Sequence, residues 1–193
     1  MTSLVLASQS PRRGQLLSQL GYSFTVCPAD IDETVLPEET PHAYVERLAR
    51  QKALSVAEQF QASDVIIGSD TTVVQSGNIL GKPSDENDCL TMLRSLSNNT
   101  HQVLTAIAVV SNQTVASEVV ATNVSFRHLS DEEIRIYWQT GEPQDKAGAY
   151  GIQGIGGQFV SNIHGSYSAV VGLPLYETAN LLKLAGIRST FGL

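Results

Sequence analysis

Two adjacent arginines, Arg12 and Arg13, follow closely after Ser8 and begin a segment with the apolar spacing of a helix. A helix N-terminus is already positive, so placing two arginines there is locally unfavourable and suggests that the charge holds an anion. Arginine presents a planar fork of donors that matches phosphate oxygens, and the anion would therefore be phosphate-like. The alternative is that both arginines are solvated residues of a surface loop.

A carboxylate, Asp70, interrupts the apolar run 65–75, which otherwise has the composition of a buried strand. A carboxylate in such a run is costly unless a cation or a metal ion accompanies it. Lys82 follows the next turn of the chain and is expected within reach of the same space. Two interpretations remain open: Asp70 caps a turn, or Asp70 belongs to a site that activates water or binds a metal ion.

A third stretch is rich in glycine, with five glycines between positions 148 and 157. Such a loop allows the backbone to come close to a ligand. It is not a Rossmann fingerprint, because no G-x-G-x-x-G lies between a strand and a helix, and the chain contains no Walker motif. A glycine-rich connection without a ligand is the competing interpretation.

These residues need elements to position them, and the sequence marks several element boundaries. Ser10 is predicted to cap the first helix with its hydroxyl, Pro11 to be its first residue and Gly21 to close it. Helix signals also occur at Thr40 with Pro41, at residues 84–86, at residues 130–133 and at Pro174. Strands are predicted over residues 23–27, 65–75, 101–111, 114–126 and 158–161, with a helix from about 42 to 60.

The order of these elements predicts one α/β domain over residues 1–193, an elongated mixed sheet flanked by helices whose long central strands are partly antiparallel. The formal net charge of −7 argues against nucleic-acid binding, which needs a broad basic face. No run of 18 apolar residues and no leader segment occur, so we expect neither a membrane span nor export. Two separated cysteines, Cys27 and Cys89, imply neither a zinc site nor a disulfide, which favours a cytoplasmic protein.

Several short motifs occur in one order along nearly the whole chain, and together they resemble the Maf family of nucleoside triphosphate pyrophosphatases. The motifs are Ser8-Gln9-Ser10-Pro11-Arg12-Arg13, Gly68-Ser69-Asp70-Thr71, Gly81-Lys82-Pro83, Thr100-His101 and Asp145-Lys146-Ala147-Gly148. The resemblance implies a fold related to that of inosine-triphosphate pyrophosphatases, usually as a homodimer. It also implies metal-dependent cleavage of a nucleotide between its α and β phosphates, with release of a nucleoside monophosphate and pyrophosphate.

The resemblance also implies roles for individual residues. Asp70 matches the family's catalytic carboxylate, and Glu33 matches an acidic position near the metal ion, which would be Mg²⁺ or Mn²⁺. The residues implied to bind the substrate's phosphates are Ser8, Arg12, Arg13, Lys52 and Lys82. Cations around a polyphosphate would offset its charge and stabilise the leaving pyrophosphate.

Three positions match the branch of the family that acts on dTTP and UTP: Arg12, Thr71 and Gln153. The resemblance therefore implies that these residues contribute to substrate specificity. Gln153 would hydrogen-bond a pyrimidine edge, while the glycine-rich loop lets the backbone approach the base.

The leading hypothesis is therefore a pyrophosphatase that removes dTTP, UTP and modified pyrimidine nucleotides from the nucleotide pool. A second hypothesis is a nucleotide-binding regulator of cell division or septum formation without useful catalysis. A positioned carboxylate such as Asp70 argues against this regulator, because a pure binder of anions would not need it. A third hypothesis is a different phosphate ester bound at the same phosphate site.

Overall fold

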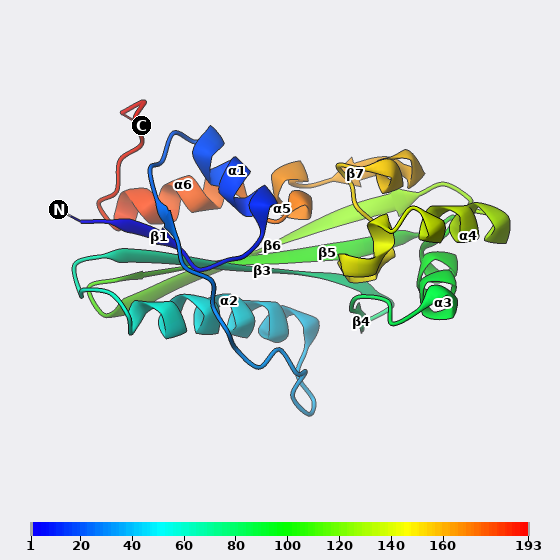
Figure 1. Ribbon diagram of the computed structural model, residues 1–193, viewed down its shortest axis with the longest axis horizontal. Helices are drawn as coiled ribbons and strands as arrows, with labels where there is room; N and C mark the ends of the chain where they lie inside the picture. The colour runs from blue at the N-terminus through cyan, green and yellow to red at the C-terminus, as the bar shows by residue number, and fades with distance from the viewer. Residues whose placement is uncertain (1, 193) are drawn as a thin grey trace.

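One mixed sheet of seven strands runs along the molecule in the computed structural model, which describes residues 2–192. Its strand order is β2-β1-β3-β5-β6-β7, and β4 also pairs with β3 (Figure 1). The strands are β1 (Leu4–Leu6), β2 (Thr25–Val26), β3 (Val65–Gln75), β4 (Asn78–Leu80), β5 (Thr100–Ser111), β6 (Thr114–Phe126) and β7 (Val160–His164).

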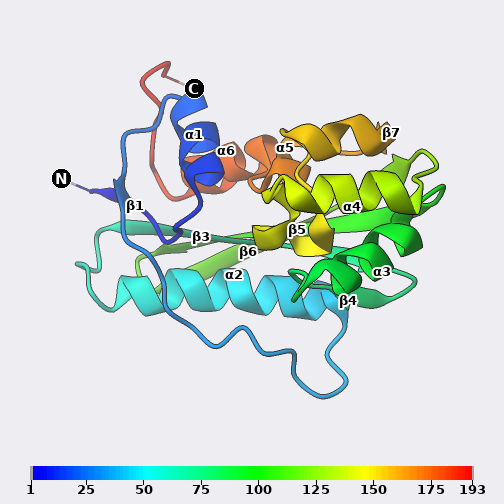
Figure 2. The same cartoon turned by 45° about the vertical axis from the view of Figure 1, so that its right-hand side comes forward.

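Helices cover both faces of the sheet (Figures 1 and 2). The long α2 lies along one face, α1, α5 and α6 lie over the other, and α3 and α4 lie toward the far end of the sheet. The helices are α1 (Pro11–Gln19), α2 (Pro41–Ala57), α3 (Glu86–Leu96), α4 (Asp131–Gln139), α5 (Tyr167–Val171) and α6 (Leu175–Leu184). The α/β fold with a mixed sheet flanked by helices is as predicted.

The apolar run of β3 is explained by burial on both of its faces. Ile66 packs with Val45 and Ala49 of α2 in one apolar cluster. Ile67, the next residue, packs with Leu17 of α1 and Leu182 of α6 in a second cluster. Because side chains alternate along a strand, a helix layer on each face requires apolar residues at successive positions.

A third apolar cluster forms the far end of the molecule, where α3, α4 and the glycine-rich segment meet. Its centre is the fully buried Phe159, whose ring contacts Tyr137 and Phe126 edge-on. Phe159 ends a short 3-10 helix (Ile155–Phe159), and β7 begins one residue later. The observed strand therefore begins two residues after the start of the predicted strand over 158–161, and it extends to His164.

The antiparallel pairing of the long central strands is confirmed. β5 pairs with β3 on one side and with β6 on the other, both antiparallel. The turn between β5 and β6 contains Asn112 and Gln113, both with positive φ. The predicted strand 23–27 is reduced to the two residues of β2, and α2 ends at Ala57, three residues before the predicted end.

Helix starts follow the predicted signals, with one correction. Thr40 accepts a hydrogen bond from the N–H of Ala43, and Asp85 and Ser130 cap α3 and α4 in the same way. Ser10 precedes α1 as expected, but its hydroxyl makes no capping bond, so that prediction is wrong. Its backbone N–H instead donates to Ser8 Oγ, which holds the chain in a turn before the helix.

Candidate active site

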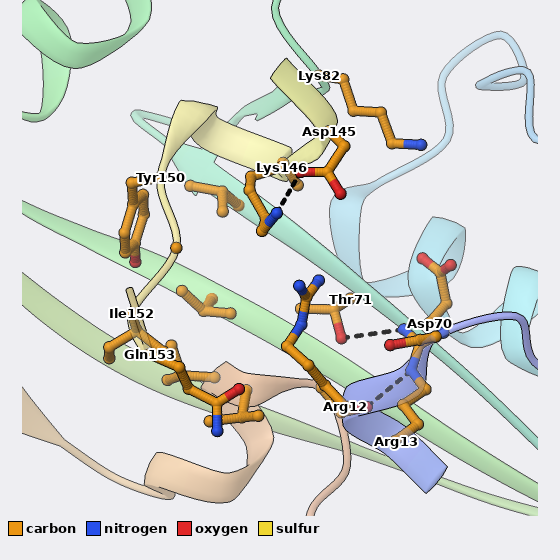
Figure 3. A pocket seen from close by; sticks show the side chains of 18 of the residues that line it. Arg12, Arg13, Asp70, Thr71, Lys82, Asp145, Lys146, Tyr150, Ile152 and Gln153 are labelled. Carbon is orange, nitrogen blue, oxygen red and sulfur yellow. Dashed lines mark hydrogen bonds and ion pairs between the residues drawn. The ribbon is translucent and has the colours of Figure 1, made fainter. Parts of the chain in front are cut away.

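A cavity of about 620 Å³ opens beside the middle of β3 (Figure 3). We call one side of it the cationic end, formed by Arg13, Lys52, Asp70 and Glu33. We call the other side the loop end, formed by residues 142–154. Predicted site residues that line this cavity are Arg12, Arg13, Glu33, Lys52, Asp70, Thr71, Lys82 and Gln153.

The position of the cavity follows from an interruption in the sheet. On one edge of β3, β1 pairs with residues 65–67 and β4 pairs with residues 73–75. Among the described strands, none covers residues 68–72 on this edge, while β5 pairs along the opposite edge. Asp70 and Thr71 lie in this interval, so their side chains can meet groups that come from both faces of the sheet.

Lys52 reaches Asp70 because α2 packs unusually close to β3. A Cβ atom on Gly68 would lie 2.3 Å from the carbonyl oxygen of Ala49 and 2.7 Å from the backbone nitrogen of Ala53. Only glycine allows this close approach. Lys52 lies on the same helix, about one turn after Ala49, and its side chain projects over the strand. The Lys52 Nζ atom lies 2.6 Å from Asp70 Oδ1.

Glu33 completes this ion-pair group from the long loop before α2. Its Oε1 atom lies 2.7 Å from Lys52 Nζ, so one ammonium holds two carboxylates. The Glu33 side chain is half exposed, whereas those of Lys52 and Asp70 are about nine-tenths buried. The loop therefore delivers a solvent-accessible carboxylate next to a buried one.

The environment of Asp70 favours a carboxyl group that can accept a proton. Burial raises the pKa of Asp70, and the nearby Lys52 and Arg13 cations offset this effect only in part. A raised pKa makes a carboxylate a stronger base, which is useful at a catalytic position. The chemistry expected of Asp70 from the sequence is therefore compatible with its surroundings.

Arg13 is fixed by three acceptors from three separate segments of the chain. Its guanidinium donates to the carbonyl oxygen of Gly172 at 2.9 Å, to Ser8 Oγ at 3.2 Å and to Thr71 Oγ1 at 3.4 Å. Ser8 is buried and is not among the cavity-lining residues, so its hydroxyl orients Arg13 from behind. Thr71 likewise faces Arg13, and it also lies 3.1 Å from the Thr105 hydroxyl.

Arg12 and Lys82 differ from Arg13 and Lys52 in having no fixed partner. Both line the cavity, and within residues 2–192 neither forms an ion pair. Arg12 extends into the cavity from the start of α1, and Lys82 approaches from the turn after β4 (Figure 3). Two cations are thus available to a ligand, whereas two others are already held in position.

The loop end contributes residues that sequence reasoning did not assign. Lys146 and Asp145 form an ion pair at the cavity wall, beside Glu142, Tyr150 and Ile152. Asp145 and Lys146 belong to one of the motifs noted in the sequence, which was a usable signal. Glu142 belongs to none, and no pattern in the sequence marks it.

Two glycines of the glycine-rich loop, Gly154 and Gly156, are explained by packing against protein, while Gly151 and Gly154 also line the cavity. A Cβ atom on Gly154 would lie 2.2 Å from Glu142 Oε2, and one on Gly156 would lie 2.6 Å from the Tyr137 hydroxyl. At these two positions the missing side chain leaves space for Glu142 and Tyr137. A close approach of the backbone to a ligand is not needed to explain them.

Known proteins match this chain along nearly its whole length. A family model described as "Maf-like protein" matches residues 3–185. A dTTP/UTP pyrophosphatase of Colwellia psychrerythraea is 59% identical over 95% of this chain and 88% of that protein. Proteins of the same name from Pseudoalteromonas translucida and Vibrio cholerae are 59% and 53% identical, over 95% and 94% of this chain and 97% of each relative.

Solved structures are more distant. A HAM1 protein from Coxiella burnetii is 16% identical, with a TM-score of 0.49 over 96% of this chain and all of that chain. A dITP/XTP pyrophosphatase from Mycobacterium abscessus is also 16% identical, with a TM-score of 0.42 over 65% of this chain and 74% of that chain. Within residues 2–192, no helix has the length and apolar content needed to span a bilayer.

Proposed function

The chain belongs to the Maf family, and on this premise we propose that it hydrolyses dTTP and UTP to the nucleoside monophosphate and pyrophosphate. One observation carries the proposal: a buried carboxylate, Asp70, lies in a cavity that is also lined by five cationic side chains. A site that only bound an anionic ligand would gain nothing from a carboxylate facing it. The relatives at 52–59% identity are named for this activity.

The cations divide the work of holding the triphosphate. Arg13 is held by Ser8, Thr71 and Gly172, so its donors are oriented before the substrate arrives. Arg12 and Lys82 are free to close on the remaining phosphate oxygens. Together these groups offset the charge that develops on the departing pyrophosphate.

Asp70 orients the attacking water and accepts its proton. Lys52 bonds to Oδ1, which leaves Oδ2 to accept a hydrogen bond from water. Lys52 thereby fixes the orientation of the carboxylate, while burial keeps it basic. The water attacks the α phosphate, the bond from the α phosphorus to the bridging oxygen breaks, and pyrophosphate leaves.

A divalent metal ion, Mg²⁺ or Mn²⁺, fits the residues present. The Glu33 and Asp70 carboxylates lie next to each other on the Lys52 ammonium, and a divalent ion would be held by the carboxylate oxygens that this ammonium leaves free. Residues 2–192 contain no group of three or more acidic, histidine or cysteine side chains suited to a metal ion. Magnesium is commonly held by one or two carboxylates together with substrate phosphates, which matches this pair.

When bound, such an ion supplies charge that polarises the phosphates and acidifies a water molecule. We expect chelation with EDTA to stop pyrophosphate release and added Mg²⁺ or Mn²⁺ to restore it. Replacing Glu33 by Gln should raise the metal concentration for half-maximal activity about 10-fold. Glu38→Gln, an exposed change in the same loop, should leave it unchanged; equal metal requirements in both variants would exclude Glu33 as a ligand.

A nucleotide panel with product identification tests the proposed function. Purified protein with Mg²⁺ is incubated with each common nucleoside triphosphate and with modified pyrimidine triphosphates. We expect dTTP and UTP to be the best substrates and the products to be monophosphate and pyrophosphate. Orthophosphate as product would exclude cleavage between the α and β phosphates, and binding without turnover would favour a nucleotide-binding regulator of cell division.

We also propose that the protein acts in the cytoplasm as a homodimer, on nucleotides and without nucleic acid. These expectations rest on the family and on the acidic composition, with a net charge of −7. Light scattering coupled to size-exclusion chromatography should give about twice the 20.7 kDa mass of one chain. A single-chain mass at micromolar concentration would refute the dimer.

A further inference from the structure

Glu142 has a set of hydrogen bonds that the proposed chemistry does not use. Its Oε2 atom accepts from the N–H of Ile155 at 2.8 Å, and its Oε1 atom accepts from the N–H of Gly156 at 2.9 Å. Oε1 also accepts from the Tyr137 hydroxyl at 2.7 Å. The carboxylate thus holds two N–H groups of the loop and the Tyr137 hydroxyl of α4, and ties the loop to α4 by charge-assisted hydrogen bonds.

Tyr137 extends the same connection to the other side of the loop. Its hydroxyl oxygen accepts from the N–H of Gly151 at 3.2 Å while its proton goes to Glu142. The ring is 2% exposed and packs edge-on against the fully buried Phe159, with 4.9 Å between the ring centroids. The hydroxyl is therefore supported by the core at the far end of the molecule.

Together these contacts bracket Gln153. The N–H of Gly151 is bound before it, and the N–H groups of Ile155 and Gly156 are bound after it. Gln153 is exposed and projects from the short interval between these points (Figure 3). Tyr150, the residue before Gly151, is itself anchored, because its hydroxyl lies 2.8 Å from Nε2 of the buried His101.

We infer that Glu142 and Tyr137 form a clamp that positions Gln153 for recognition of the pyrimidine base. The inference rests on the proposed function, because it assigns a base-selecting role to the loop end of that same site. Glu142 and Tyr137 are positioning residues here: they act on the substrate through the backbone that carries Gln153. This explains why glycines occupy positions 154 and 156, where any side chain would displace the carboxylate or the hydroxyl.

The charge state of Glu142 suits this role. Burial raises the pKa of the carboxyl, but the N–H groups of Gly156 and Ile155 and the Tyr137 hydroxyl outweigh burial, and the pKa is lowered overall. The group is ionised at neutral pH and only accepts hydrogen bonds. A glutamine there would present an NH₂ group to at least one donor, so it cannot reproduce all three bonds.

The test compares nucleotides that differ only in the base. We would measure kcat/KM for UTP and CTP, with tripolyphosphate as a competitive inhibitor that has no base. Glu142→Ala should reduce the preference for UTP over CTP by up to about 10-fold, the loss expected when the polar contact made by Gln153 is no longer held in place. The inhibition constant for tripolyphosphate should change less than about 2-fold, because the cationic end is untouched.

Matched variants separate positioning from general damage. Glu132→Gln removes an exposed carboxylate of α4 and should leave the base preference unchanged. Glu142→Gln should lie between the wild type and Glu142→Ala. Tyr137→Phe removes only the hydroxyl, so it should reduce the preference even if Glu142→Ala does not fold.

Two results would overturn the inference. One is an unchanged preference for UTP over CTP in Glu142→Ala, or in Tyr137→Phe where the alanine variant does not fold. The other is an equal weakening of tripolyphosphate inhibition, which would assign Glu142 to phosphate binding or to the fold as a whole. A wild-type protein that hydrolyses neither UTP nor dTTP would instead refute the proposed function, so the two failures are distinguishable.

Discussion

The two ends of the cavity are built in different ways. At the cationic end, Arg13, Lys52 and Asp70 come from α1, α2 and β3, whose backbones fix the direction of each side chain. At the loop end, Gln153 lies on a segment without regular strands or long helices, held by bonds from Glu142 and Tyr137. Regular elements suit groups whose spacing the chemistry requires, and a clamped loop suits groups whose identity sets the substrate.

This contrast predicts separable effects on turnover and on base choice. Changes at the cationic end should slow all nucleotides alike, because every substrate carries the same triphosphate. Changes at the loop end should alter the ranking of nucleotides and spare the chemistry.

Asp70→Asn should have the largest effect. It keeps the shape of the side chain and removes the base, so turnover should fall by roughly 10²- to 10⁴-fold for every nucleotide. Release of pyrophosphate from dTTP measures the effect, and circular dichroism checks the fold. Near-normal turnover in this variant would remove Asp70 from the mechanism.

Gly68→Ala tests whether the close contact between α2 and β3 sets the reach of Lys52. The added Cβ would lie 2.3 Å from the Ala49 carbonyl oxygen, so α2 must move away from the strand. We expect a loss of roughly 1–3 kcal/mol in the free energy of unfolding, as is typical of overpacking. Turnover should fall for all nucleotides because Lys52 moves relative to Asp70.

The matched control for this change is Gly81→Ala, where an added Cβ meets nothing within 4 Å. Both stability and turnover should stay near the wild-type values there. If Gly68→Ala behaves like Gly81→Ala, the helix contact does not set the geometry of the cationic end.

Much of the cationic end could be predicted from the sequence, for a physical reason. A strand or a helix start leaves a local pattern, and Asp70 and Arg13 stand beside such patterns. The gap at residues 68–72 could not be predicted, because it depends on where two other strands stop pairing. Lys52 was named only through the family resemblance, because a lysine on a helix is usually solvated and its local pattern carries no signal.

The loop end was predictable only in part. The glycines at 154 and 156 marked a loop, but their partner is a glutamate at least 12 residues earlier that carries no local signal. Ser10 shows the opposite error. Its local pattern predicts a capping bond from its hydroxyl, but the structure has instead a bond from its backbone N–H to the hydroxyl of Ser8. Local rules describe elements well and describe contacts between segments poorly.

Replacing His101, which contacts Tyr150 of the loop end, should have the smallest effect on turnover. Its expected effect is on how the stability of the protein depends on pH. Burial lowers the pKa of His101 to about 4, from an ordinary value near 6.5. Between these values the unfolded chain takes up a proton that the folded protein does not, so stability falls as pH falls. The loss between pH 7 and pH 5 should be about 2 kcal/mol, and below the folded pKa no further loss arises.

Urea unfolding at pH 7 and pH 5 measures this effect. In His101→Phe the loss of stability between the two pH values should be smaller by the same amount, whereas replacing the exposed His164 by Asn should leave it unchanged. Identical pH dependence in the wild type and His101→Phe would show that His101 is not buried in its neutral form.

The most direct test of the division between the two ends compares Asp70→Asn with Gln153→Ala on dTTP, UTP and CTP, with the released phosphate identified. We expect pyrophosphate as the product of the wild type and a uniform loss of turnover for all three nucleotides in Asp70→Asn. Gln153→Ala should keep kcat within about 3-fold while the preference for UTP over CTP falls about 10-fold, the magnitude expected for lost polar contacts. Orthophosphate as product, or a uniform loss of turnover in Gln153→Ala with the preference unchanged, would contradict these expectations.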